Sequence, residues 1–127
     1  MTCVFCQRLR VGPLIKASEH AGAFADAFPV SPGHTLVVSR RHEANFFALP
    51  ADEQAAVWEL AAVVVRDLGY AHRPDGFNLG LNAGAAAGQT VSHAHVHVIP
   101  RYAGDIDDPR GGVRWVKPGQ AAYWNGP

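Results

Sequence analysis

The chain has 127 residues, of which 48% are hydrophobic and 17% charged, proportions typical of one folded globular domain rather than of a disordered segment. Eleven basic and eleven acidic side chains cancel, so no overall field attracts a nucleic acid polymer or an anionic membrane surface. The apolar runs are too short to span a membrane and the N-terminus lacks the pattern of a signal peptide, so we expect a cytoplasmic protein.

The first part of the chain predicts a β-hairpin. Residues 22–28 alternate as a strand does, with alanines on one face and larger side chains on the other: Phe24, Asp26 and Phe28. A turn rich in proline and glycine over 29–33 separates this strand from the β-branched run 34–39, which predicts the partner strand.

Two helices are expected next, a short one at about 43–49 and a long one at about 52–69. Asp52 and Glu53 suit the positive end of the long helix, and Gly69 suits its stop. Its apolar residues recur at helical spacing: Val57, Leu60, Ala61, Val64, Val65 and Leu68.

The second half of the chain predicts further strands. Residues 76–82 are expected to form one, a small-residue loop follows over 84–88, and residues 93–99 and 113–116 are expected to form two more. Strands on both sides of a single long helix indicate an α+β fold with a mainly antiparallel sheet of about five strands.

Three histidines alternate with apolar residues at positions 93, 95 and 97, which places their rings on one strand face about 6.6 Å apart. Exposed histidines on an edge strand would be one explanation. A metal held by a His-x-His pair is a second, although the outer two rings, roughly 13 Å apart along the strand, cannot share one ion. Nucleophilic catalysis at phosphorus is the third, because neutral imidazole is a good nucleophile near pH 7.

The loop before this strand supports the third explanation. Residues 82–90 begin and end with polar side chains, and glycines interrupt the alanines between them. Such a loop lets backbone N–H groups approach phosphate oxygens, although a plain hairpin loop has similar composition.

The motif His93-x-His95-x-His97, preceded by Gly88-Gln-Thr-Val91, resembles the histidine triad superfamily of nucleotide hydrolases and transferases. Further matches lie at 31–38, 76–82 and 99–101. The Gln-Thr-Val and the Pro-Arg after the strand are closer to the dinucleoside polyphosphate hydrolase (fragile histidine triad) branch than to the phosphoramidase branch. The likeness implies a single domain over 1–127, with a core at about 3–105 and a C-terminal extension at 106–127.

The resemblance implies a mechanism without a catalytic metal. His95 would attack the α-phosphorus and form a nucleotidyl-histidine intermediate, while His97 would bind a phosphate oxygen or assist the leaving group. His34 would support the site, and Gln89 would lie near the leaving group. Val4 would line the base pocket. The nucleotide-binding residues implied are Phe5, Asp26, Asn82, Gly88, Gln89, Thr90, His95 and His97.

Cys3 and Cys6 form a Cys-x-x-Cys pair, which by itself fits two ordinary thiols, a redox pair or half of a zinc site. The family resemblance implies a structural zinc ion with two further ligands, His42 and His93, that would attach the N-terminus to the sheet. His20 and His72 receive no role and are expected at the surface.

The resemblance further implies a purine nucleotide or dinucleotide as substrate and a homodimer. A nucleotide-binding adaptor with incidental hydrolysis is one alternative. A zinc-dependent enzyme that uses His93 and His95 as ligands is another. The segment 108–115 resembles an extension of bacterial members of the family, whose aromatic residues could reach the active site: Trp115, Tyr123 and Trp124.

Overall fold

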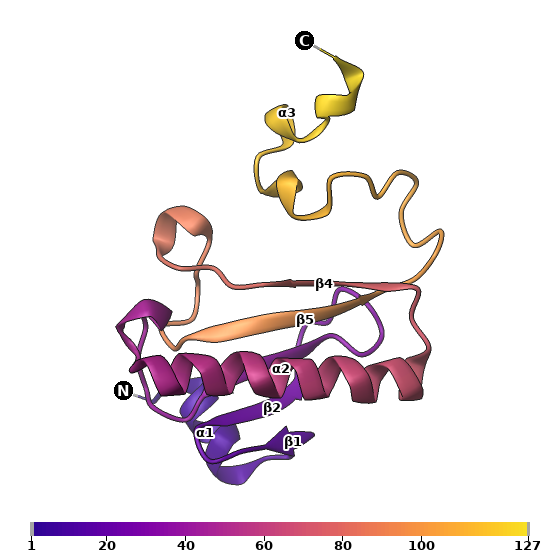
Figure 1. The fold of residues 1–127 in the computed structure, drawn as a ribbon. Coiled ribbons are helices and arrows are strands. Elements are labelled where there is room, and N and C mark those ends of the chain that lie inside the picture. The colour runs from indigo at the N-terminus through magenta and orange to yellow at the C-terminus, as the bar shows by residue number, and fades with distance from the viewer. Residues whose placement is uncertain (1, 127) are drawn as a thin grey trace.

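A computed structural model describes residues 2–126 and has the predicted α+β architecture, a five-stranded antiparallel sheet with a long helix across one face (Figure 1). The strand order is β1-β2-β3-β5-β4. The strands are β1 Lys16–Ala17, β2 Ala21–Ala25, β3 Thr35–Ser39, β4 Gly76–Gly80 and β5 His95–Arg101. The α-helices are α1 Val4–Val11, α2 Ala51–His72 and α3 Pro118–Ala121. The 3-10 helices are η1 Phe46–Ala48, η2 Ala85–Ala87, η3 Gly112–Val116 and η4 Tyr123–Asn125.

The main hydrophobic core lies between α2 and the sheet, and it confirms the alternation expected of the histidine strand. The residues between the histidines, Ala94, Val96 and Val98, are buried against the apolar face of α2. The histidines therefore lie on the opposite face of the sheet. A smaller apolar cluster occupies that second face: Phe5, Phe24, Leu36 and Val38.

Helix α2 confirms the predicted long helix and runs one turn further, to His72. Gly69 does not end it. The chain leaves the helix at Arg73, which adopts the left-handed conformation (φ 49°) that usually marks a helix C-terminus. No helix within residues 2–126 combines the length and apolar character needed to cross a membrane.

The short helix expected at 43–49 is a single 3-10 turn, η1. The carbonyl of Glu43 accepts a hydrogen bond from the Ala94 backbone N–H (2.6 Å), so residue 43 is tied to the sheet instead of starting a helix. Asn45 caps the turn by accepting a hydrogen bond from the Phe47 N–H (3.1 Å).

Helix α1 was not expected from the sequence. The Cys3 side chain caps it by accepting a hydrogen bond from the Cys6 backbone N–H, with an N–S distance of 3.5 Å. Phe5 on this helix is buried against Phe24 of β2, with ring centroids 5.5 Å apart. Helix α1 therefore covers part of the sheet face that carries the histidines.

The strand expected at 113–116 is wrong, because this segment forms η3. Gly111 and Gly112 both have positive φ, and the backbone continues in i→i+3 hydrogen bonds such as Arg114 N–H to the Gly111 carbonyl (2.9 Å). The C-terminal segment lies on the β4 side of the sheet (Figure 1).

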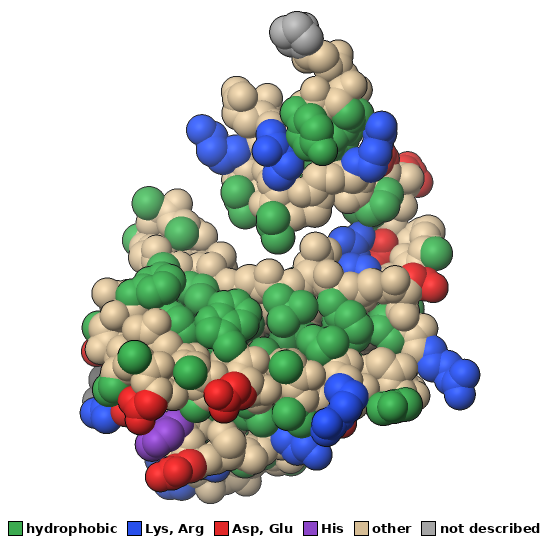
Figure 2. All heavy atoms as spheres, in the orientation of Figure 1, with side chains coloured by type: hydrophobic (Ala, Val, Ile, Leu, Met, Phe, Trp, Pro, Cys, Tyr) green, Lys and Arg blue, Asp and Glu red, His purple; other side chains and the backbone are tan. Residues whose placement is uncertain are grey.

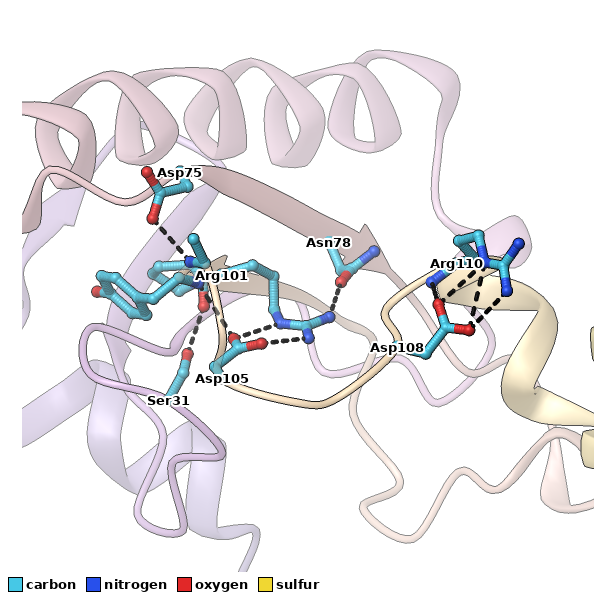
Figure 3. Close-up of polar contacts among 10 residues, drawn as sticks. Ser31, Asp75, Asn78, Arg101, Asp105, Asp108 and Arg110 are labelled. Carbon is cyan, nitrogen blue, oxygen red and sulfur yellow. Dashed lines mark hydrogen bonds and ion pairs between the residues drawn. The ribbon is translucent and has the colours of Figure 1, made fainter.

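Arg101, at the end of β5, holds the start of the C-terminal segment. It donates two hydrogen bonds to Asp105, both 2.8 Å, and one to the Asn78 side chain of β4 (2.7 Å) (Figure 3). The Arg101 guanidinium keeps the pKa of the Asp105 carboxyl well below its usual range. The pair is therefore charged at neutral pH.

Candidate active site

A cavity of about 550 Å³ opens on the sheet face that carries the histidines. Helix α1, strands β2, β3 and β5, and the loop after β4 all contribute side chains to its wall. Most of the residues expected to bind a nucleotide line it: Phe5, Asp26, His34, Asn82, Gly88, Thr90, His95 and His97. Residues from distant parts of the sequence therefore meet around one space large enough for a small ligand.

His95 is held with one ring nitrogen available to the cavity. Its Nδ1 lies 2.8 Å from the backbone carbonyl of His93, which can only accept a hydrogen bond. Nδ1 therefore carries the proton in the neutral ring, and Nε2 keeps its lone pair. The residue is 8% exposed, so the ring is fixed by its surroundings. Chemically, the lone pair on Nε2 makes this ring a positioned nucleophile.

His34 and His97 form an ordered hydrogen-bond chain beside His95. The Val30 backbone N–H donates to Nδ1 of His34 (3.1 Å), so the proton of this ring lies on Nε2. That Nε2–H points to Nδ1 of His97 (2.9 Å) and lies 3.3 Å from an oxygen of Asp26. His97 then keeps its proton on Nε2, as a hydrogen-bond donor next to the His95 ring, whose centroid is 5.1 Å away.

The hydrogen-bond chain also argues against a metal at Asp26, His34 and His97, although their ligand atoms lie within 4.8 Å of one another. A metal at this point would need the lone pair of His34 Nε2, and the Val30 N–H places a proton there instead. Burial lowers the pKa of both His34 and His97, and the Asp26 carboxylate opposes that shift in each ring. Both rings are therefore neutral at pH 7.

The loop after β4 reaches the cavity through Asn82, Gly88 and Thr90. Gln89 takes a different position. Its side-chain oxygen accepts from the Gly84 N–H (2.9 Å), and its NH₂ group donates to the carbonyls of Ala44 (2.8 Å) and Val91 (3.0 Å). Gln89 thus holds the loop closed, and contact with a substrate would require it to release these bonds.

The end of the cavity formed by α1 is more apolar. Phe5 packs edge-on against the His95 ring (centroids 4.9 Å apart), and Val4 lines the same wall. Asp26 lies on the histidine side: one carboxylate oxygen is 3.3 Å from Nε2 of His34 and 3.9 Å from Nδ1 of His97, and the other accepts from the Phe28 N–H (2.9 Å). Arg8 also lines this wall, and the sequence reasoning missed it. The 4, 5, 8 spacing of a helix face would have revealed it, had α1 been recognised.

A second group of side chains lies at the start of α1. Nδ1 of His93 is 3.4 Å from Sγ of Cys3 and 3.6 Å from Sγ of Cys6, while Nδ1 of His42 is 3.3 Å from Sγ of Cys6 and 3.3 Å from Nδ1 of His93. The four predicted ligand atoms all lie within 4.8 Å of one another. The fold therefore brings together residues from the N-terminus, the 40–42 turn and the histidine strand.

This second group has the geometry of a tetrahedral metal site. With Zn–S bonds of about 2.3 Å and Zn–N bonds of about 2.0–2.1 Å, neighbouring ligand atoms lie roughly 3.3–3.8 Å apart, and the four distances given above fall in this range. Nε2 of His93 donates to the Ser39 carbonyl (2.6 Å), which leaves the Nδ1 lone pair facing the thiols. Burial lowers the pKa of His93 and so favours the neutral ring that a metal requires, but it raises the pKa of Cys6.

The remaining candidates lie outside both groups. His20 is near Glu19 and Asp52, and His72 is exposed at the end of α2. The tail aromatics pack against their own segment: Trp115 Nε1 donates to the Arg110 carbonyl (2.7 Å), and Arg110 stacks on Trp124.

The tail residues that approach the site are instead those of η3. Gly112, Val113 and Val116 line a groove of about 460 Å³ that His34 and His97 also line. No lysine or arginine lines this groove within the described part of the chain. The C-terminal segment therefore forms an apolar wall next to the histidine chain.

Comparison with known proteins places these features in a family. The model of the HIT domain matches residues 13–104. An uncharacterized HIT-like protein of Mycoplasma genitalium is 40% identical over 104 residues, covering 80% of this chain and 74% of that protein. The adenosine 5'-monophosphoramidase of Schizosaccharomyces pombe is 35% identical, covering 80% of this chain and 75% of that enzyme. An AP-4-A phosphorylase of Mycobacterium tuberculosis is 38% identical, but the match spans only half of its length.

Solved structures agree with these sequence matches. A Zn-bound histidine triad family protein from Mycobacterium smegmatis superposes with a TM-score of 0.76 at 34% identity, covering 83% of this chain and 78% of that one. This similarity supports the observed fold.

Proposed function

This chain belongs to the HIT domain family, and we propose that it is a nucleotide hydrolase or transferase that acts at the α-phosphate of a nucleoside monophosphate unit. The bond cleaved is a phosphoanhydride or a phosphoramidate. Relatives named for each chemistry exist, an AP-4-A phosphorylase and an adenosine 5'-monophosphoramidase. The closer likeness of the sequence to the dinucleoside polyphosphate hydrolase branch remains a prediction.

The observation that carries this proposal is the hydrogen bond between Nδ1–H of His95 and the His93 carbonyl. It leaves a lone pair on Nε2 of His95 in a cavity that fits a nucleotide. In the proposed first step this lone pair forms an N–P bond to the α-phosphorus, and the leaving group departs with the electrons of the bond that breaks. Water then attacks the phosphorus, the N–P bond breaks, and the nucleotide is released.

The neighbours of His95 stabilise the charge that develops in this step. Nε2–H of His97, oriented by His34, donates a hydrogen bond to a phosphoryl oxygen or to the leaving atom. Asn82, Gly88 and Thr90 hold the phosphate. Such fixed donors lower the barrier because they are already oriented before charge develops. This explains how an overall neutral protein binds an anionic group without a cluster of lysines.

The nucleoside half is proposed to occupy the apolar end of the cavity. Phe5 would pack against the base, and the free lone pairs of the Asp26 carboxylate would accept from the ribose hydroxyls. Gln89 would act indirectly, by holding the phosphate loop in shape.

Two alternatives predict different results. An adaptor with incidental hydrolysis predicts tight nucleotide binding without useful turnover. A zinc enzyme with His93 and His95 as ligands predicts loss of activity in chelator, and the directions of the two rings disfavour it, because Nδ1 of His93 faces the cysteines.

Turnover of a substrate panel tests the proposal. Adenosine phosphoramidate and diadenosine polyphosphates are the substrates, and purified wild type, His95→Asn and the exposed-site control His72→Asn are compared. We expect wild type and control to turn over at least one substrate class, and His95→Asn to lose at least 10³-fold in kcat, since removal of a covalent nucleophile has effects of that order. An asparagine variant with wild-type kcat contradicts the proposal.

We also propose that Cys3, Cys6, His42 and His93 hold a structural zinc ion. The ligand distances and the orientation of His93 support it, as does the relative described as Zn-bound. Bound zinc would fix α1, and with it Phe5, against the sheet. It would take no part in the reaction.

A homodimer is the proposed assembly. β4 is an edge strand, and a hydrophobic band runs along α2 and the β4 side of the sheet (Figure 2). On α2 Trp58 is 41% exposed, and Phe77, Leu79 and Leu81 are only partly buried. An apolar edge of this kind is typical of a surface that pairs with another chain.

A further inference from the structure

Arg8 lies in the wall of the nucleotide cavity without a defined role there. It shares one face of α1 with Val4 and Phe5, and all three residues line the cavity. The arginine ion pairs within residues 2–126 do not include it; they are made by Arg41, Arg66, Arg101 and Arg110.

The Arg8 side chain is held in place by an aromatic ring and not by an acidic partner. Its guanidinium carbon lies 4.6 Å from the centroid of Phe24, which is 2% exposed. Its Nε is the one side-chain nitrogen or oxygen in residues 2–126 that is buried without a hydrogen-bond partner. The guanidinium is therefore positioned before any ligand binds, and its terminal NH₂ groups are the donors that remain for one.

The position of Arg8 along the cavity identifies the part of the ligand that it meets. His95 contacts Phe5 (centroids 4.9 Å apart), Phe5 contacts Phe24 (5.5 Å), and Phe24 carries Arg8. Two aromatic rings thus separate Arg8 from the nucleophile. Asp26 lies on the histidine side, 3.3 Å from Nε2 of His34 and 3.9 Å from Nδ1 of His97, so the wall formed by α1 is left for the base. A nucleotide with its α-phosphate at His95 and its ribose at Asp26 has its base at Arg8.

We infer that Arg8 reads the base and selects 6-oxopurines, guanine and hypoxanthine, over adenine. This rests on the proposed function, since it assumes the phosphate at His95. A guanidinium offers donors only, in a fork that matches the adjacent O6 and N7 acceptors of a 6-oxopurine. Adenine presents an NH₂ donor in place of O6, so one arginine donor would face another donor. Among the described residues that line the cavity, Asp26 is the one carboxylate, and with the ribose at Asp26 it would not reach the amino group of adenine.

Calorimetric titration of the full-length protein with GMP, IMP and AMP tests this inference. We expect wild type to bind GMP and IMP at least about tenfold more tightly than AMP, the discrimination typical of one bidentate arginine contact. Arg8→Met keeps an apolar stem on Phe24 and loses the donors, so the GMP-to-AMP ratio should fall to within about twofold. Arg10→Met, an exposed position of the same helix, should keep the wild-type ratio.

Further probes separate base recognition from simple attraction of an anion. Guanosine and adenosine lack phosphate, so a preference for guanosine that Arg8→Met removes supports contact with the base. The inference is overturned if Arg8→Met weakens the binding of inorganic phosphate while wild type binds guanosine and adenosine with equal affinity. If Arg8→Met does not fold, as judged by circular dichroism, Arg8→Lys replaces it and should show an intermediate ratio.

The outcomes distinguish this inference from the proposed function. If wild type binds GMP and AMP equally and turns over substrates of both, only the base assignment is wrong. If Arg8→Met weakens GMP and AMP by the same factor, Arg8 has a structural role and the inference fails. If wild type binds no nucleotide at all, both fail.

Discussion

Each imidazole of the candidate site has its proton placed by a neighbour. A backbone carbonyl sets the tautomer of His95, and a backbone N–H sets that of His34, which in turn orients His97. The same residue type can therefore present a lone pair at one position and a donor two residues later. The positions of these protons depend on backbone groups that no sequence motif displays.

The neutral state of these rings leads to a prediction about pH. Burial lowers the pKa of His34 and His97 below the ordinary value of 6.5, so between the two values the unfolded chain binds more protons than the folded one. The free energy of unfolding should therefore decrease as the pH falls below about 6.5, by at most about 1.4 kcal/mol per pH unit for each ring.

Urea unfolding between pH 7.5 and 5 measures this effect. His97→Gln should have a shallower pH dependence than wild type, whereas His72→Gln, at an exposed position, should follow the wild-type curve. A stability that rises on acidification would contradict buried neutral rings. An unchanged slope in His97→Gln would show that this ring is not responsible.

At the scale of elements, segments with a clear pattern of apolar residues could be predicted from the sequence. Helix α1 and the 3-10 helix η3, which lack such a pattern, could not. Period-2 alternation gave β2 and β5 to within a few residues, a β-branched run gave β3, and helical periodicity gave α2. Helix α1 was not predicted because its N-cap residue is a cysteine, which is not a typical N-cap residue, and the Cys-x-x-Cys pair was interpreted as part of a metal site. β-branched residues at 113–116 suggested a strand, but the glycines before them turn the chain into a 3-10 helix.

The site was predictable to a similar degree. The triad and the loop follow from the sequence pattern, whereas the set of four Cys and His positions came from the family resemblance; each group converges in space. Arg8 and the tail groove could not be found that way. The position of Arg8 depends on α1, a helix that the sequence did not reveal. The groove depends on where the chain after β5 packs against the sheet.

The attachment of α1 gives a prediction about zinc. Cys3→Ser or treatment with a strong chelator should lower Tm by about 5 °C or more, because a metal that binds only the folded chain stabilises it. Zinc content measured by mass spectrometry should fall from one ion per chain. His20→Ala, outside the ligand group, serves as the control. Substrate turnover in chelator should persist with a higher KM, since Phe5 is carried on α1; abolished chemistry would favour a catalytic metal.

The link between Arg101 and Asp105 gives a prediction about the C-terminal segment (Figure 3). Asp105→Ala removes two hydrogen bonds that tie this segment to β5, so amide hydrogen exchange should become faster over residues 106–126. Asp108→Ala breaks an exposed pair with Arg110 inside the segment and should leave exchange in η3 close to wild type. Equal protection in both variants would mean that side-chain packing alone holds the segment.

At the scale of the whole molecule, the two faces of the sheet have separate tasks. One is covered by α2 and provides the main core, whereas the other carries the histidines under α1 and the phosphate loop. The main core and the candidate site therefore lie on opposite faces of the sheet, and the histidine face has a smaller apolar cluster of its own. The balanced net charge is compatible with nucleotide binding because oriented dipoles near the cavity act locally.

The hydrophobic band on the α2 side gives a prediction about assembly. Light scattering after size exclusion should give twice the 13.6 kDa chain mass. Trp58→Glu places a charge on α2 at a half-exposed apolar position and should shift the protein toward monomer, while Tyr70→Glu, on the same helix and 81% exposed, should not. A wild-type monomer at micromolar concentration would contradict the proposed dimer.

Direct detection of the covalent intermediate tests the central claim. Wild-type protein is mixed with a substrate that carries labelled α-phosphate, quenched within milliseconds at alkaline pH to preserve phosphoramidate bonds, and digested for mass spectrometry. We predict one nucleotidyl group on the peptide that contains His95, located on that ring by fragmentation, and none in His95→Asn. Turnover by wild type without any labelled histidine, or a label on His97 or His34, would contradict the account.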